Sequence, residues 1–371
     1  MAATALPTRP LGKAEVCTFG LGGASLGDLY AKIPSVQALQ TVEAAHQAGF
    51  RYFDTSPWYG LGLSEVRMGL ALSAFPRDSY AVSTKVGRTL HPHRDEATWS
   101  SLSWAGGLQN SIEYAYGHDD VIQQHRESLL RLGVGRVEAL VIHDMEEAES
   151  QAPGTHRRGT RGHLAGTAAG GRPGGYAALE GLRRSGTVKA IGAGVNYAIG
   201  TANHTADTYR AWNVNYVDFL LSLKGEGERP IDFLLLAGCY NMLELSAWTD
   251  GILQRCIDNG VSVVVGGAFA TGILATGAVD GAKYNYEDAS PRVLAKVAAM
   301  EAVCREFEVA LAAVALQFPL GHPAVASVIP GCKSVPEVTR CAEMVSTVVP
   351  PALWDRLKEE SLLPRDVPTP S

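Results

Sequence analysis

Short apolar runs alternate with segments of helical periodicity along most of the chain. The apolar runs are mostly continuous, which is typical of parallel strands that are buried on both faces. Between them, apolar residues recur three or four positions apart, as in segment 35–49, which begins at a serine and ends at a glycine. The predicted strands cover residues 17–23, 50–55, 80–85, 137–144, 188–195, 231–237, 261–266 and 324–329. The predicted helices cover residues 35–49, 119–132, 176–186 and 248–259, and two more begin at Ser64 and Val335.

This order of elements favours a closed parallel barrel of the α/β class, a (β/α)8 TIM barrel. An open doubly wound sheet is the alternative, but it would carry a Gly-x-Gly-x-x-Gly fingerprint. After Gly20 and Gly22, the third position of that fingerprint is Ser25. We therefore expect one barrel domain over residues 1–371.

Three segments of the chain exceed ordinary loop length, at about residues 87–118, 145–175 and 206–230. The first two are expected to overhang the active-site face. The second is rich in glycine and arginine, a composition that predicts mobility. The third is expected to hold a helix and a turn rich in glycine, glutamate and arginine.

Several of the predicted strands end on polar residues. Asp54, Lys85, His143 and Asn196 all lie at such ends, and Tyr59 follows Asp54 in a glycine-closed loop. In a barrel, the carboxyl ends of the strands form the active site. Taken singly, each residue has an ordinary structural explanation, such as a capping carboxylate or a core histidine. Together they predict a site.

The grouping suggests proton transfer through the Tyr59 phenol. Lys85 beside Tyr59 is expected to favour the phenolate and so to lower the phenol pKa from about 10. Asp54 would pair with Lys85, and His143 would donate a hydrogen bond to a substrate oxygen. Such a site moves a proton on or off an oxygen while another agent moves a hydride.

Composition excludes several other classes of protein. The net charge of −6 gives no basic surface for nucleic acid, and no run of about 18 apolar residues exists to span a membrane. The six cysteines are widely spaced, which favours reduced thiols over disulfides or a metal site. The amino terminus shows no secretory signal. We expect a cytoplasmic protein that contains no metal.

The site residues resemble those of a known family. Asp54-Thr-Ser-Pro-Trp-Tyr59-Gly60, Ser83-Thr-Lys85 and Ile142-His143-Asp144 match, in order and spacing, the Asp, Tyr, Lys and His tetrad of the aldo-keto reductase superfamily. Segments 233–238, 266–274 and 316–331 resemble its aldose dehydrogenase branch. The resemblance covers nearly the whole chain except the long loops. It implies catalytic roles for Asp54, Tyr59, Lys85 and His143, and a barrel that binds NAD or NADP without a Rossmann motif.

The resemblance also implies cofactor contacts, although these positions match the family less fully. The family's serine before the carboxamide-binding asparagine is Val195 here, and Gly266 replaces its stacking tyrosine. Lys333 and Arg340 would suit the 2′-phosphate of NADP, whereas the aldose dehydrogenase resemblance favours NAD. The coenzyme therefore stays open. The expected cofactor-binding residues are Gly22, Gly23, Asp54, Asn196, Phe269, Gly331, Lys333, Ser334 and Arg340.

The expected function is NAD(P)-dependent oxidation of an aldose, such as L-fucose, D-arabinose or L-galactose, to its lactone. The alternatives are an NADPH-dependent aldehyde or ketone reductase, a pyridoxal 4-dehydrogenase, and a non-enzymatic nicotinamide-binding regulatory subunit. The expected partner is a small sugar or carbonyl substrate, and the oligomeric state is open.

Overall fold

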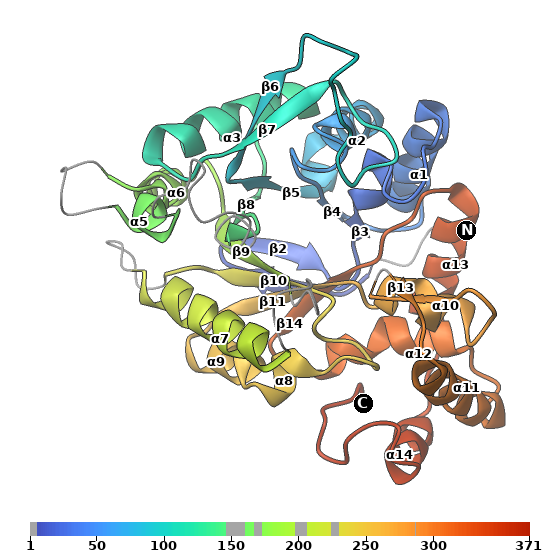
Figure 1. The fold of residues 1–371 in the computed structure, drawn as a ribbon. Helices are drawn as coiled ribbons and strands as arrows, with labels where there is room; N and C mark the ends of the chain where they lie inside the picture. Colours follow the sequence, from blue (N-terminus) through green and yellow to red (C-terminus); the bar gives the residue numbers. More distant parts are fainter. Residues whose placement is uncertain (1–5, 146–159, 167–172, 197–205, 224–229, 286) are drawn as a thin grey trace.

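The computed structural model describes residues 6–145, 160–166, 173–196, 206–223, 230–285 and 287–371. Its centre is an eight-stranded parallel sheet in the order β14-β11-β10-β9-β8-β5-β4-β3 (Figure 1). Parallel bridges from Phe19 to Val328 and from Gly22 to Gly331 join its two edge strands, so the sheet closes. The expected (β/α)8 TIM barrel is confirmed. Its strands are β3 (Leu21–Gly22), β4 (Tyr52–Asp54), β5 (Ala81–Val86), β8 (Ala139–Ile142), β9 (Ala190–Asn196), β10 (Phe233–Ala237), β11 (Ser262–Gly266) and β14 (Val325–Ile329).

Helices surround the barrel on the outside (Figure 1). Among the described residues they are α1 (Ser35–Gln47), α2 (Leu63–Leu72), α3 (His118–Leu132), α5 (Thr160–Ala165), α6 (Gly175–Arg184), α7 (Ala206–Ser222), α8 (Ser246–Thr249), α9 (Ile252–Asp258), α10 (Ile273–Thr276), α11 (Pro291–Glu306), α12 (Leu311–Gln317), α13 (Val335–Ser346) and α14 (Pro351–Glu359). The helix predicted over 248–259 is two short helices, because the backbone at Gly251 is left-handed, with φ of 75°.

The core has two parts, which explains the continuous apolar runs of the strands. Side chains that alternate along each strand point to opposite faces. Val141 and Phe233 lie in a cluster inside the barrel, whereas Leu140 and Ile142 belong to the larger cluster that includes the surrounding helices. Because both faces of each strand are buried, a polar residue at a strand end marks the rim of the barrel rather than a solvent-facing side.

Three antiparallel strand pairs among the described residues were not predicted from the sequence. The expected strand 17–23 divides into β2 (Ala14–Cys17), which pairs with β1 (Thr8–Leu11), and the barrel strand β3. This hairpin covers the amino end of the barrel, where the Lys13 amide donates to the Lys189 carbonyl. The second hairpin, β6 (Arg88–Pro92) and β7 (Asn110–Tyr114), lies within the expected loop 87–118. A short pair, β12 (Lys283–Tyr284) and β13 (Glu287–Asp288), was also not predicted.

The other two long segments are only partly described. Segment 145–175 contains α5, which was not predicted, and the expected mobility otherwise falls largely on residues outside the described ones. Segment 206–230 holds α7, as predicted, while its expected turn lies outside the described residues. Helices α10, α11, α12 and α14 were not predicted either.

The structure bears on the cysteines, on membrane-spanning helices and on metal sites. All six cysteines are buried free thiols. Within the described ranges, no helix combines the length and apolar character needed to cross a bilayer. The described part of the chain also contains no cluster of three or more acidic, cysteine or histidine residues arranged to hold a metal.

Candidate active site

The four residues of the predicted tetrad come together at the carboxyl end of the barrel. Asp54 is the last residue of β4, Lys85 is the penultimate residue of β5, and His143 directly follows β8. These three strands are neighbours in the sheet, so their carboxyl ends meet at one rim. Tyr59 reaches the same rim from the loop between β4 and α2, with its ring centroid 5.8 Å from that of His143.

Asp54 and Lys85 form a buried ion pair. Lys85 Nζ donates to Asp54 Oδ2 at 2.5 Å and to the Thr55 carbonyl at 2.9 Å, and both paired side chains are almost fully buried. The other carboxylate oxygen of Asp54 accepts from the Ser83 hydroxyl at 2.7 Å. Burial alone would lower the pKa of Lys85, but the Asp54 carboxylate and Tyr59 raise it above its ordinary value. Lys85 is therefore a fixed cation in the site.

Tyr59 lies directly against this cation. Lys85 Nζ is 4.6 Å from the centroid of the phenol ring. Lys85 lowers the pKa of Tyr59, as predicted, but burial has the larger effect, and Asp54 acts in the same direction as burial. Together they raise the pKa of Tyr59 to about 12. The expectation of a net lowering was wrong, because the sequence does not reveal how far the phenol is desolvated.

His143 is held as a neutral imidazole. Burial first, and then the cations Arg88 and Lys85, lower its pKa well below the ordinary value. Its Nδ1 lies 2.9 Å from Ser56 Oγ, and its Nε2 lies 3.2 Å from Asp144 Oδ2. Because a carboxylate oxygen can only accept, the nearby Asp144 favours the tautomer with its proton on Nε2, in which the Ser56 hydroxyl donates to Nδ1. With this assignment the Nε2–H lies beside Asp144 Oδ2, and its donation to a substrate oxygen stays a prediction.

An ion pair beside His143 was not predicted from the sequence. Arg88, from β6, donates to Asp144 Oδ2 at 3.1 Å, and its guanidinium lies 5.0 Å from the ring centroids of both Trp58 and Tyr114. Asn196 Nδ2 donates to the other oxygen of Asp144 at 2.6 Å. Asp144 thus links the predicted cofactor residue Asn196 to His143. The only indication in the sequence that Asp144 belongs to the site is that it directly follows His143.

Replacing Ser56 with alanine tests the assignment of the His143 proton. In the wild type the Ser56 hydroxyl contacts Nδ1 and accepts a hydrogen bond from the Trp58 amide. The variant leaves both nitrogen atoms without the Ser56 hydroxyl. We expect unfolding free energy to fall by about 1–3 kcal/mol, the cost of unsatisfied buried polar groups. We also expect the ¹⁵N shifts of His143 to show less of the Nε2–H form.

The matched control is Ser73→Ala, which removes only an exposed hydrogen bond at the end of α2. It should change the unfolding free energy by no more than about 0.5 kcal/mol. Equal melting temperatures for the two variants, with unchanged His143 shifts, would contradict the proton assignment.

Some of the expected cofactor residues, such as Asp54 and Asn196, lie at strand ends on the same rim, whereas Ser334 and Arg340 cap or belong to the outer helix α13. Lys333 and Arg340, at the start of α13 and within it, are exposed and make no ion pair with the described residues. Ser334 caps α13, whose amino end favours anions. A Cβ added at Gly266 would come no nearer than 3.7 Å to any described atom, so this glycine leaves space at the end of β11. Unpaired cations, a helix amino end and open space suit a dinucleotide.

Other predicted cofactor contacts have a structural explanation or stay predictions. A Cβ at Gly22 would meet the Ile329 carbonyl at 3.0 Å, so barrel closure accounts for this glycine. A Cβ at Gly23 would meet the Asp54 carbonyl at 2.7 Å, so close packing against the end of β4 accounts for the second glycine. Gly331 bridges to Gly22 across the closing strands. Phe269 is half-buried in the loop after β11.

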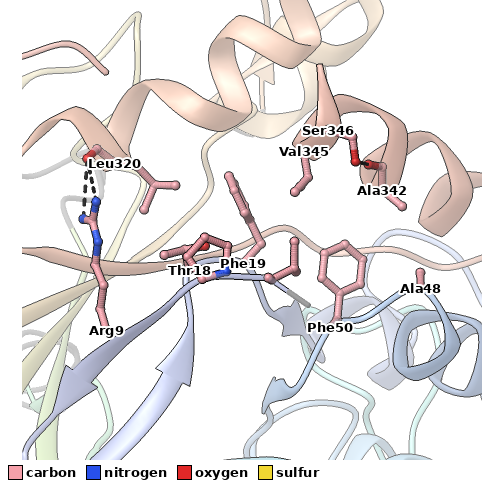
Figure 2. A pocket seen from close by; sticks show the side chains of 11 residues that line it. Arg9, Thr18, Phe19, Ala48, Phe50, Leu320, Ala342, Val345 and Ser346 are labelled. Carbon is pink, nitrogen blue, oxygen red and sulfur yellow. Dashed lines mark hydrogen bonds between the residues drawn. The ribbon is translucent and has the colours of Figure 1, made fainter. Parts of the chain in front are cut away.

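A separate pocket of about 600 Å³ lies at the amino end of the barrel, away from the tetrad (Figure 2). Apolar side chains such as Phe19, Phe50 and Val345 line it. Its one charged residue, Arg9, donates to the Leu320 carbonyl and has no acid beside it in the lining. This pocket lacks the acid–base groups that the rim contains.

Known proteins resemble this chain over nearly its full length. The model of the aldo/keto reductase family matches residues 18–361. D-threo-aldose 1-dehydrogenase from a Pseudomonas species is 32% identical over 354 residues, covering 93% of this chain and 94% of the relative. Pyridoxal 4-dehydrogenase from Microbacterium luteolum is 31% identical over 365 residues, covering 96% of this chain and 97% of the relative.

Solved structures show the same fold. A glycerol dehydrogenase from Gluconobacter oxydans matches with a TM-score of 0.66 and 18% identity, covering 100% of both chains. An aldo/keto reductase from Klebsiella pneumoniae, solved with NADP and acetate, matches with a TM-score of 0.62 and 17% identity over 99% of both chains. The family match, the two relatives and the barrel agree, and the chain belongs to the aldo/keto reductase family of oxidoreductase enzymes.

Proposed function

We propose that this enzyme oxidises the anomeric carbon of a free aldose to a lactone with NAD or NADP. The observation that carries the proposal is the contact of the Tyr59 phenol with the buried Lys85–Asp54 pair, beside a neutral histidine. The similarity to D-threo-aldose 1-dehydrogenase supports an aldose as the substrate. Other relatives named for aldoses are L-galactose dehydrogenase from Arabidopsis thaliana and D-arabinose 1-dehydrogenase from Saccharomyces cerevisiae.

In this proposal Tyr59 is the acid–base group. As phenolate it takes the proton of the anomeric hydroxyl, and it returns to the neutral phenol as the carbonyl of the lactone forms. Bound NAD(P) would supply the hydride-accepting group. The ammonium of Lys85 stabilises the phenolate, and Asp54 holds that ammonium in place. The Nε2–H of His143 orients the substrate oxygen.

In the reverse direction, the same residues serve a carbonyl reductase. The high pKa of Tyr59 keeps the phenol protonated at neutral pH, and a protonated phenol is the form that reduction of an aldehyde needs. Pyridoxal is a second candidate substrate, because a pyridoxal 4-dehydrogenase is 31% identical to this chain. A substrate screen must therefore cover both directions and both chemical classes.

The deciding experiment is reduction of NAD⁺ and of NADP⁺ by the purified protein with L-fucose, D-arabinose, L-galactose and pyridoxal, followed at 340 nm. We expect turnover with at least one aldose, and a lactone as the product. Turnover with pyridoxal alone would replace the proposed substrate class. Cofactor binding without turnover of any sugar or aldehyde would favour a regulatory subunit and overturn the proposal.

Lys333→Ala is expected to weaken binding of NADP more than binding of NAD. The exposed ammonium of Lys333 would contact only the 2′-phosphate, which NAD lacks. The expected loss is about fivefold in the dissociation constant for NADP, which is the scale of one exposed ion pair. Titration of intrinsic fluorescence with each coenzyme measures it. Lys13→Ala, in the exposed turn at the amino end, is the control. Equal losses for both coenzymes would remove Lys333 from the 2′-phosphate site.

A further inference from the structure

Trp104 has a buried indole N–H that bonds to no described residue. Its side chain is only 5% exposed, and Nε1 has no hydrogen-bond partner in the part of the chain that the structure describes. A buried Trp N–H usually finds an acceptor, because leaving it unsatisfied costs stability. The other tryptophan of this segment, Trp99, follows that rule and donates to the Asn110 carbonyl at 3.0 Å. The unsatisfied N–H of Trp104 therefore needs an explanation.

The indole of Trp104 lies beside the catalytic phenol. Its ring centroid is 5.7 Å from that of Tyr59 and 5.5 Å from that of Trp58. Tyr59 is in turn 5.8 Å from His143. The indole of Trp104 therefore belongs to the same group of rings as Tyr59, Trp58 and His143.

The turn that carries Trp104 is fixed, directly after the indole, to two segments near Tyr59. The amide of Ala105 donates to the Asp28 carbonyl at 3.0 Å, and the amide of Leu108 donates to the Gly60 carbonyl at 2.9 Å. Gly107 lies so close to Gly60 that an added Cβ would meet its carbonyl oxygen at 2.8 Å. These contacts join the turn to the backbone next to the phenol.

Asp28, one of these anchors, is itself held by a buried ion pair. Its carboxylate accepts from Arg67 at 2.7 Å, and both side chains are buried. The indole is therefore placed before any substrate arrives, which is how a recognition group avoids ordering costs on binding.

We propose that the N–H of Trp104 binds the substrate, donating a hydrogen bond to a hydroxyl oxygen near the reacting carbon. The inference rests on the proposed function and adds that the enzyme prefers substrates with a hydroxyl group next to the reacting carbon over analogues that lack it. A site with a buried donor discriminates against an analogue that lacks the acceptor, because the donor then stays unpaired in the complex. Trp104 is thus a specificity-determining residue rather than part of the proton transfer.

The test compares two aldehydes that differ only in their hydroxyl groups, DL-glyceraldehyde and propanal, in the reductive direction with the coenzyme that the enzyme prefers. Trp104→Phe keeps an aromatic ring beside Tyr59 and removes the N–H. We expect kcat/KM for glyceraldehyde to fall about tenfold, the scale of one hydrogen bond. We expect the value for propanal to stay within about twofold, and coenzyme affinity to be unchanged.

Trp99→Phe is the matched control, since it lies in the same segment but its N–H is already bonded. It should alter kcat/KM for the two aldehydes by equal factors. Equal losses on both aldehydes in Trp104→Phe, or no loss on either, would overturn the role of Trp104 while leaving the proposed function intact. A wild-type enzyme that turns over no sugar and neither aldehyde would instead overturn the proposed function, and with it this inference.

Discussion

Tyr59→Phe is expected to reduce turnover on the true substrate by a factor of about 10² or more, the scale of general acid–base catalysis. The variant loses only the phenolic oxygen. Its ring still packs against Trp104 and His143, so the fold and the coenzyme dissociation constant should barely change. Steady-state rates on the best substrate, together with coenzyme titration and a melting curve, measure all three quantities.

The control for this experiment is Tyr80→Phe. Tyr80 is a buried tyrosine at the start of β5, away from the rim, and its loss should leave turnover within about twofold. If Tyr59→Phe kept turnover within a few-fold of wild type, the proton would have to come from another group and the proposed mechanism would be wrong.

Lys85→Met should have the second large effect, on both pH dependence and stability. Lys85 lowers the pKa of the Tyr59 phenol against the effect of burial, so its removal raises that pKa further. Each added unit of pKa cuts the phenolate fraction about tenfold, and we expect kcat/KM for oxidation at neutral pH to fall by at least that factor. Removing one partner of a buried ion pair should also cost about 3–5 kcal/mol of unfolding free energy, read from denaturant curves.

A double variant separates the two effects. Asp54→Asn combined with Lys85→Met removes both charges, so it should recover stability relative to Lys85→Met alone without recovering oxidation. Oxidation that recovers together with stability would show that Lys85 acts only as a structural residue. Wild-type stability and rates in Lys85→Met would contradict the ion pair itself.

The barrel and most of the site could be predicted because both follow from local patterns. Continuous apolar runs mark strands buried on two faces, and the carboxyl ends of parallel strands meet at one rim whatever the distances along the chain. Asp54, Lys85 and His143 could therefore be placed together although they come from three separate strands. The motif containing Tyr59 added the fourth residue.

The environment of the site could not be predicted, because it depends on contacts between distant segments. Arg88 reaches Asp144, and Trp104 reaches Tyr59, only through the β6–β7 hairpin. Hairpins are recognised in sequences by short turns of two to about five residues, whereas residues 93–109 separate these strands.

The pKa of Tyr59 shows the same limit of sequence reasoning. A sequence can place a lysine next to a tyrosine, but it cannot weigh that cation against burial of the phenol and a second carboxylate. The direct effect of Lys85 was predicted correctly, and the net direction was not.

The most direct test of Tyr59 as the acid–base group is the pH dependence of kcat/KM in both directions on the wild-type enzyme. Oxidation needs the phenolate, and reduction needs the neutral phenol. Because the pKa of Tyr59 is raised to about 12, oxidation should increase by about tenfold per unit from about pH 7 to about pH 10 without levelling off, while reduction stays flat. Profiles that run parallel in the two directions, and that Lys85→Met leaves unshifted, would contradict the account.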